Sequence, residues 1–294
     1  DTQMRRAEAM VLAMALTGDT FQSSERTKAL GLLEAANGLG KVLSPILGSL
    51  IALLSWYAPF FAYGLLAFPI AIGVWLLVPE KKQNLSKDSL AQYWCKVKEV
   101  FREQATHLIA CYLVGMVALF LLFGVLSYVS DVLESTYHLF GLVKGFVLAV
   151  PVFSMALTSY LSGLYLAQKR SLWKPIIVGA MFAVAACLAL QPFFTKLVPY
   201  MTVLFFLGIG IGIVLPPINS LITGATSADR RGIITCLYGT VRFFGVAIGP
   251  PTFGLALELG KWFLFLSSAA LAVITALVAL FAITPPPAGA YTAE

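Results

Sequence analysis

Charged side chains are rare within the long apolar stretches of this sequence. A charge inside a membrane is costly, so each one is a candidate functional group. Three charged residues lie well within these stretches, namely Glu34, Lys41 and Arg242. Glu34 and Lys41 stand seven residues apart, two helical turns on one face, with Asn37 between them. That spacing is too long for a direct pair on one helix, so each side chain is expected to meet another helix or water.

A buried carboxyl group and a nearby cation are the parts needed to bind and release a proton, because burial and charge act on proton affinity in opposite directions. We therefore expect Glu34 to exchange a proton, and Lys41 or Arg242 to alter the pKa of its carboxyl group. A static buried ion pair that locks two parts of the molecule together fits the same residues equally well.

Two further polar positions lie in or beside apolar stretches. Asp131 and Glu134 stand at the predicted outer end of one stretch. They could form an entrance for protons, and an ordinary hydrated loop edge is the alternative. Asn219, in the sequence LPPINS, is a candidate cavity-lining residue. The preceding Pro216-Pro217 predicts a broken or kinked helix, because proline removes a backbone hydrogen bond.

The elements that must position these residues are membrane helices. The chain has 294 residues, of which 59% are hydrophobic and only 12% charged, whereas soluble domains carry about 25% charged residues. Apolar stretches of about 20 residues span a bilayer as helices, and the fold class is therefore all-α membrane. Spans are predicted at 29–54, 58–78, 106–130, 141–167, 174–194, 200–223, 232–257 and 262–283, after a shorter apolar piece at 7–20.

Basic residues orient these spans. If the piece at 7–20 ends at the cytoplasm, the connections on that side contain thirteen lysines and arginines and the opposite connections only three. This is a clear positive-inside bias, which places the linker and the C-terminus in the cytoplasm. The net charge of +6 follows from the same asymmetry, so no nucleic-acid partner is expected. The three opposite residues are Lys144, Lys196 and Lys261.

One long polar connection divides the chain. Within Pro79–Gln104, apolar residues recur at helical spacing between charged ones, which predicts an amphipathic helix on the cytoplasmic membrane surface; a solvated linker is the alternative. The expected organisation is the end of an N-terminal helical bundle (1–79), a cytoplasmic linker (80–105) and a C-terminal six-helix bundle (106–294).

No known catalytic or cofactor-binding pattern occurs. The four cysteines are far apart, and two histidines are too few for a metal cluster. HExxH, GxSxG, paired aspartates in facing spans and a glycine-rich phosphate loop are absent from the sequence. We therefore expect no enzyme activity, no metal and no cofactor.

A repeat links two spans about 205 residues apart. In each copy an arginine precedes a glycine by 14 residues and a proline by 19. The copies are Arg26, Gly40 and Pro45, and Arg231, Gly245 and Pro250. Both enter from the cytoplasm, which is typical of transporters built from parallel six-helix repeats. The glycine-rich spans would then be helices five and eleven, with three helices and part of a fourth expected before Asp1.

Small residues explain why helix-breakers stand in these spans. Glycine and serine on one face let another helix backbone approach closely, and proline bends the helix. The predicted packing residues are Gly31, Gly38, Gly40, Ser44, Pro45 and Gly48 in the first copy, and Gly245, Gly249 and Pro250 in the second. Arg242 takes the repeat position of Asn37.

The first copy resembles a known motif. Its pattern is similar to the antiporter motif in the fifth helix of drug:proton antiporters of the Major Facilitator Superfamily, although a serine replaces the usual glycine before the proline. The pattern is Gly31-x8-Gly40-x3-Ser44-Pro45-x2-Gly48-Ser49. The resemblance covers essentially the whole chain and implies two pseudo-symmetric six-helix bundles, present from part of helix four to helix twelve. By the same resemblance, Asp19, Arg26 and Arg231 are cytoplasmic gate candidates.

The resemblance also implies a function. It implies a monomeric plasma-membrane exporter that exchanges protons for small amphipathic molecules by alternating access. A metabolite or sugar symporter of the same fold fits less well, because the spans carry few polar side chains for hydroxyl-rich ligands. A non-transporting membrane scaffold or receptor stays open, although it gives no reason for a bent, glycine-lined helix to occur twice.

Overall fold

The computed structural model describes residues 23–77, 90–166, 169–225 and 228–284, and every regular element in these ranges is helical. The long helices are α2 (Ser23–Ala52), α3 (Ala58–Leu77), α4 (Leu90–Ser135), α5 (Gly141–Leu166), α6 (Trp173–Leu190), α7 (Leu197–Gly224), α8 (Ala228–Glu258) and α9 (Lys261–Ala282). Two short 3-10 turns, Arg170–Leu172 and Gln191–Phe193, flank α6.

Six of these elements are long and apolar enough to cross a membrane, by length and composition. They are Gln104–Ser135, Gly141–Leu166, Arg170–Phe193, Leu197–Gly224, Gly232–Glu258 and Lys261–Ala282. They coincide with the six spans predicted after the linker. The two spans predicted before it are the helices α2 and α3, and α3 contributes a shorter apolar stretch, Ala58–Gly73. The all-helical fold class is confirmed.

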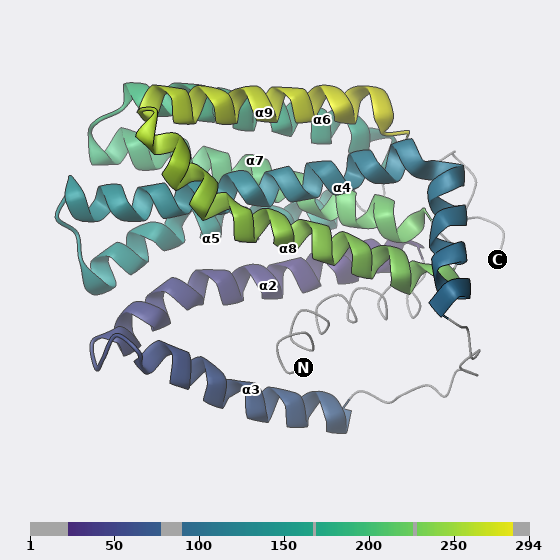
Figure 1. Cartoon of the computed structure of the whole chain (residues 1–294), viewed down its shortest axis with the longest axis horizontal. Coiled ribbons are helices and arrows are strands. Elements are labelled where there is room, and N and C mark those ends of the chain that lie inside the picture. Colours follow the sequence, from purple (N-terminus) through teal and green to yellow (C-terminus); the bar gives the residue numbers. More distant parts are fainter. Residues whose placement is uncertain (1–22, 78–89, 167–168, 226–227, 285–294) are drawn as a thin grey trace.

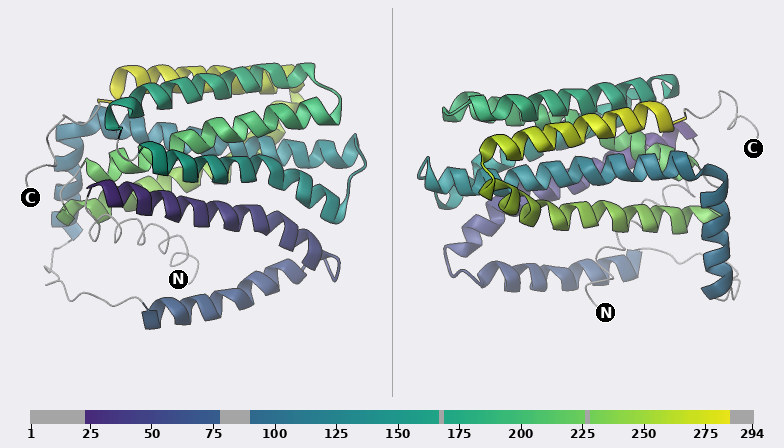
Figure 2. Two further views of the ribbon diagram at one scale, coloured as in Figure 1. Left: turned by 180° about the vertical axis from the view of Figure 1, so that it is seen from behind. Right: turned by 45° about the horizontal axis from the view of Figure 1, so that its top comes forward.

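The helices α4 to α9 form one bundle, and α2 runs along it beside α5 (Figures 1 and 2). α3 turns back from α2 and lies apart from the bundle in all three views. The turns that follow α2, α4, α6 and α8 gather at one end of the molecule, the left end in Figure 1. Successive helices therefore alternate in direction, as the charge pattern requires.

Helix α4 has a break near its start. Gln104 has non-helical backbone angles (φ −134°, ψ 28°), which separates a first segment, 90–103, from the apolar segment that follows. The first segment lies at a steep angle to the bundle in Figure 1. The part of the linker that the structure describes, from Leu90, is helical. Its amphipathic placement on the membrane surface stays a prediction.

Proline acts differently in different helices. The break allowed for at Pro216-Pro217 is not present, because α7 continues through both residues to Gly224. A helix packed among other helices can tolerate proline, since neighbouring groups satisfy the freed carbonyls. α8 bends markedly toward its C-terminal end, which contains Pro250 and Pro251 (Figure 1).

Candidate transport site

A close helix contact in the C-terminal bundle joins α8 to α4. A Cβ atom built on Gly245 would lie 2.5 Å from the carbonyl oxygen of Met116, and one on Gly249 would lie 2.8 Å from that of Phe120. No side chain fits at either position without a shift. The backbones of α4 and α8 therefore touch, which is how small residues hold membrane helices together.

The same face of α8 is polar nearer its N-terminal end. Arg242 is 2% exposed, and its guanidinium carbon lies 5.9 Å from the centre of the Tyr238 ring, within the range of a cation–π contact. The rings of Tyr238 and Tyr112 are 5.6 Å apart, and the Tyr112 hydroxyl donates a 2.6 Å hydrogen bond to the carbonyl oxygen of Ile234. Arg242 is thus held among aromatic rings between α4 and α8.

Tyr238 was not singled out from the sequence, yet a signal for it exists. Thr235, Tyr238, Arg242, Gly245 and Gly249 are spaced by three or four residues, so they share one face of α8. Along that face, the polar side chains of Thr235, Tyr238 and Arg242 are followed by two glycines. The change in residue size along a single helical stripe is the pattern that would have identified it.

The contact between α2 and α5 is close at Gly38, and not at Gly40, which is the residue that the repeat aligns with Gly245. A Cβ atom on Gly38 would collide with the Cβ of Ala156 and lie 3.0 Å from its Cα. Asn37, next to this contact, is half-buried, and its side-chain nitrogen is buried with no hydrogen-bond partner in the part of the chain that the structure describes. Among the described residues nothing lies within 4 Å of a Cβ built on Gly40. The packing role predicted for Gly40 therefore stays a prediction.

The end of α2 is tied to α3 through one tyrosine. The Tyr63 hydroxyl donates to the carbonyl oxygen of Ser44 over 2.9 Å and lies 3.3 Å from the Ser44 hydroxyl. A Cβ on Gly48 would lie in ordinary contact with the same hydroxyl, at 3.6 Å. Ser44 and Gly48 thus face α3 and not the bundle.

Several predicted site residues lie outside what the structure describes. Asp19 falls before the first described residue. The backbones of six others lie in α2 or α8, but their side chains are not described: Arg26, Gly31, Glu34, Lys41, Pro45 and Arg231. The proposed exchange between Glu34 and a cation remains a prediction.

Small and hydroxylated residues also join α5 to α7. Ser159 and Ser162 donate hydrogen bonds to the carbonyl oxygens of Gly212 and Ile213, at 3.0 and 3.1 Å. Asn219, further along α7, is 1% exposed, and the Thr223 hydroxyl donates to its carbonyl oxygen over 2.9 Å. Asn219 is therefore enclosed by the bundle in this state.

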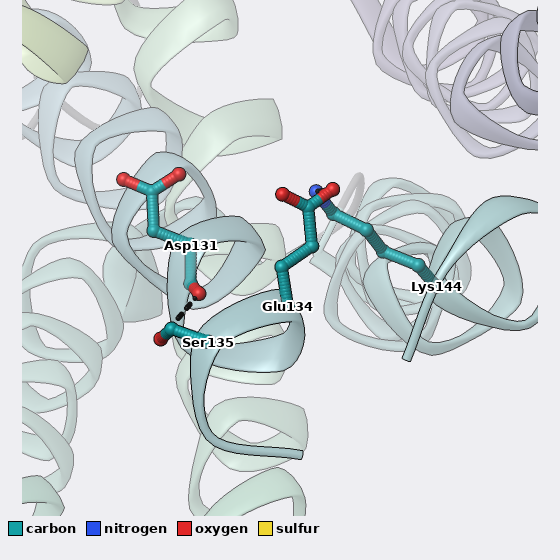
Figure 3. A network of polar contacts seen from close by, with 4 residues as sticks. All are labelled: Asp131, Glu134, Ser135 and Lys144. Carbon is teal, nitrogen blue, oxygen red and sulfur yellow. Dashed lines mark hydrogen bonds and ion pairs between the residues drawn. The ribbon is translucent and has the colours of Figure 1, made fainter. Parts of the chain in front are cut away.

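Where α4 ends and α5 begins, an ion pair connects the two helices. The Lys144 ammonium lies 2.6 Å from a carboxylate oxygen of Glu134 (Figure 3). The carboxylate of Asp131 is exposed and points away from this pair, while the Ser135 hydroxyl donates to the Asp131 carbonyl oxygen over 2.8 Å. Burial raises the pKa of the nearby Tyr137 phenol. The structure thus pairs the Glu134 carboxylate with the Lys144 ammonium and leaves the Asp131 carboxylate exposed.

Comparison with known proteins gives one family. The model of the Major Facilitator Superfamily matches residues 7–250. The "Bacillibactin exporter" of Bacillus subtilis (strain 168) is 32% identical over 94% of this chain and 69% of its own length. The "Multidrug efflux protein YfmO" of the same organism is 27% identical over 79% of this chain and 56% of its own length.

Among solved structures, that of the human organic anion transporter MFSD10 (TETRAN) is similar with a TM-score of 0.71 over 92% of this chain and 67% of that one. Its sequence is 17% identical, so this likeness concerns the fold alone. The multi-pass helical architecture, the family match over most of the chain and the relatives named as exporters agree with one another. The chain belongs to the Major Facilitator Superfamily and is a membrane transporter, not an enzyme.

Proposed function

We propose that this protein is a proton-coupled exporter of small amphipathic molecules that works by alternating access in the plasma membrane. In this proposal residues 1–79 belong to one helical bundle and residues 106–294 form the other, with 80–105 joining them on the cytoplasmic side. The observation that carries the proposal is the contact of α2 with α5, where Gly38 leaves no room for a side chain against Ala156.

A contact of this kind suits two bundles that move against each other. Without a side chain between them the two backbones meet at van der Waals distance, so the contact excludes water and ions. Rigid halves that rock about such contacts expose a central site alternately to each side. The relatives named as exporters support outward transport of the cargo.

Proton coupling rests on the ionisable residues within the spans. Glu34 supplies the carboxyl group, and Lys41 or Arg242 supplies the charge that alters its proton affinity. Arg242 is buried among tyrosines, and a desolvated cation acts on its surroundings more strongly than a hydrated one. A single proton on Glu34 would then shift the balance between the inward-facing and outward-facing states.

The test is transport into inside-out membrane vesicles that carry the protein. An imposed proton gradient is expected to drive accumulation of a cationic amphipathic dye, or of bacillibactin as the cargo named for one relative. The Glu34→Gln variant should lose the dependence on the gradient but keep downhill exchange of the same cargo. Glu258→Gln, at the exposed outer end of α8, is the matched control and should keep both.

Three results would overturn parts of this proposal. Normal gradient-driven export by Glu34→Gln would remove this carboxyl group from the coupling. Cargo movement with the protons, not against them, would make the protein a symporter. Absence of both transport and photolabelling by the cargo would favour a scaffold or receptor.

A further inference from the structure

The cytoplasmic end of the bundle contains a cavity that the transport proposal does not use. It has a volume of about 360 Å³ and lies between the break in α4 and the end of α9. Its lining residues are Gln104, Ala105, Thr106, His107, Phe281, Ala282 and Thr284. The cavity therefore adjoins the point at which the linker helix changes direction and the point at which the last helix ends.

His107 bridges these two elements. Its Nδ1 atom accepts a 3.2 Å hydrogen bond from the backbone N–H of Thr284. Its Nε2 atom lies 3.8 Å from the sulfur of Cys111, one turn further along α4. An Nδ1 atom that accepts a hydrogen bond carries no proton, so the imidazole is neutral here, with its proton on Nε2.

We propose that His107 is a pH-sensitive latch that holds the end of α9 against the break in α4. A proton added to Nδ1 would turn the acceptor into a donor that faces the Thr284 N–H, so the backbone hydrogen bond is lost. Imidazole is the side chain whose charge changes nearest to neutral pH. Acidification of the cytoplasm thus frees the end of α9 beside the joint of the linker helix. This role is independent of the proton coupling proposed above.

The surroundings contain little else that titrates. On α4 the Cys111 thiol, which is buried, faces the imidazole, and Tyr112 is turned toward α8 by its hydrogen bond to Ile234. None of the α9 residues that line the cavity is ionisable, and no charged side chain lines it in the part of the chain that the structure describes. Among the residues that the structure describes, the imidazole is therefore the group here whose charge changes.

The Thr284 hydroxyl gives the protonated state a second contact. Its oxygen lies 3.4 Å from Nδ1, so a protonated Nδ1 can donate to it. In the protonated state the hydrogen bond of His107 is made with the Thr284 hydroxyl instead of the Thr284 backbone N–H, and the end of α9 is held less firmly. Replacement of Thr284 by valine keeps the backbone N–H and removes this contact, so release on protonation becomes complete.

Hydrogen–deuterium exchange of the membrane-embedded protein tests the latch directly. Protection of the Thr284 amide, corrected for the intrinsic rate, is expected to fall by up to roughly tenfold between pH 7.5 and pH 5, the loss of about one net hydrogen bond. The neighbouring Ile283 amide is the internal control, because it donates to the Ala279 carbonyl oxygen over 3.2 Å and this acceptor does not titrate. Thr284→Val should deepen the fall at residue 284.

The decisive variant is His107→Asn, whose Oδ1 takes the place of Nδ1 and does not titrate. It should hold the amide of residue 284 equally at both pH values. Unchanged protection of wild-type Thr284 at pH 5, or the same pH dependence in His107→Asn, would overturn the proposal. If that variant does not reach the membrane, the wild-type titration against Ile283, together with Thr284→Val, decides the matter.

Discussion

Helices α2 and α8 carry the same order of arginine, glycine and proline, yet they use their small residues on different faces. In α8, Gly245 and Gly249 lie against the backbone of α4. In α2 the residue at the repeat position of Gly245 is Gly40, and the close contact belongs instead to Gly38. Two residues correspond to a rotation of about 200° around a helix, so the two contacts lie on nearly opposite sides.

The difference shows what such a repeat determines. It marks where along a helix small residues occur, while the neighbouring helix decides which face they use. α8 packs within its own bundle, whereas α2 packs on α5 across the linker. By the repeat, the other face of α2, with Gly40, is expected to contact another helix.

A second difference is a bulky residue where α2 has a glycine. Phe253 takes the repeat position of Gly48, and its ring lies directly on Gly124 of α4, while Gly48 faces Tyr63. In the α4–α8 pair the glycine has thus moved to the partner helix. The ring of Phe253 is 2% exposed and meets Phe120 edge-on at 5.7 Å.

The largest expected effect comes from removing that ring. Phe253→Ala leaves a cavity opposite Gly124, and loss of a buried phenylalanine costs about 3–5 kcal/mol of unfolding free energy in soluble proteins. Lipid is as apolar as the core, so only the packing part is lost and the lower end of that range is expected. Thermal unfolding in detergent measures it. Phe263→Ala, with a half-exposed ring on α9, is the control; equal losses in the two variants would contradict the contact.

The next effect tests the backbone contact of α8. Gly245→Ala places a methyl group against the Met116 carbonyl, and overpacking of this kind costs about 1–3 kcal/mol. Gly254→Ala lies on the same helix with nothing within 4 Å, and should be stabilised by up to about 1 kcal/mol through helix propensity. The two variants are expected to shift the melting temperature in opposite directions, and a shift of the same sign in both would argue against the close approach of α4 and α8.

The corresponding change in α2 should act on transport more than on stability. Gly38→Ala drives α2 away from Ala156 at an estimated cost of about 1 kcal/mol, and the loosened interface should slow export. Adding Ala156→Gly returns the space, so the double variant should recover most of the rate. Gly64→Ala in α3, with nothing within 4 Å, is the control. Additive losses in the double variant would show that the two residues do not meet.

The sequence was sufficient for the helices and their order. Span length is set by bilayer thickness, so the predicted spans coincide with α4 to α9 without any knowledge of contacts. The glycine and proline spacing also located two helices, α2 and α8, that pack closely on a neighbour through glycine. These features are local, because one segment and its solvent determine them.

The partners of the side chains could not be predicted in the same way. A contact such as Gly38 with Ala156 joins residues 118 positions apart, and its face depends on how α2 lies on α5. Glu134 and not Asp131 meets Lys144 for the same reason, since a turn brings the start of α5 to one side of α4. The continuity of α7 through Pro216-Pro217 reflects the helices around it, which the local sequence does not reveal.

The smallest expected effect is at the Glu134–Lys144 pair, which links the end of α4 to the start of α5. The Glu134 side chain is 49% exposed, and exposed pairs contribute from about 0.2 to 1 kcal/mol. Glu134→Gln and Lys144→Met should each lower the melting temperature slightly, and a double-mutant cycle should return a coupling within that range that weakens as salt is added. Asp131→Asn, one turn away and turned outward, should show no coupling to Lys144. A coupling as large for Asp131 as for Glu134 would mean that Lys144 alternates between the two carboxylates, which would contradict the single pairing in the structure.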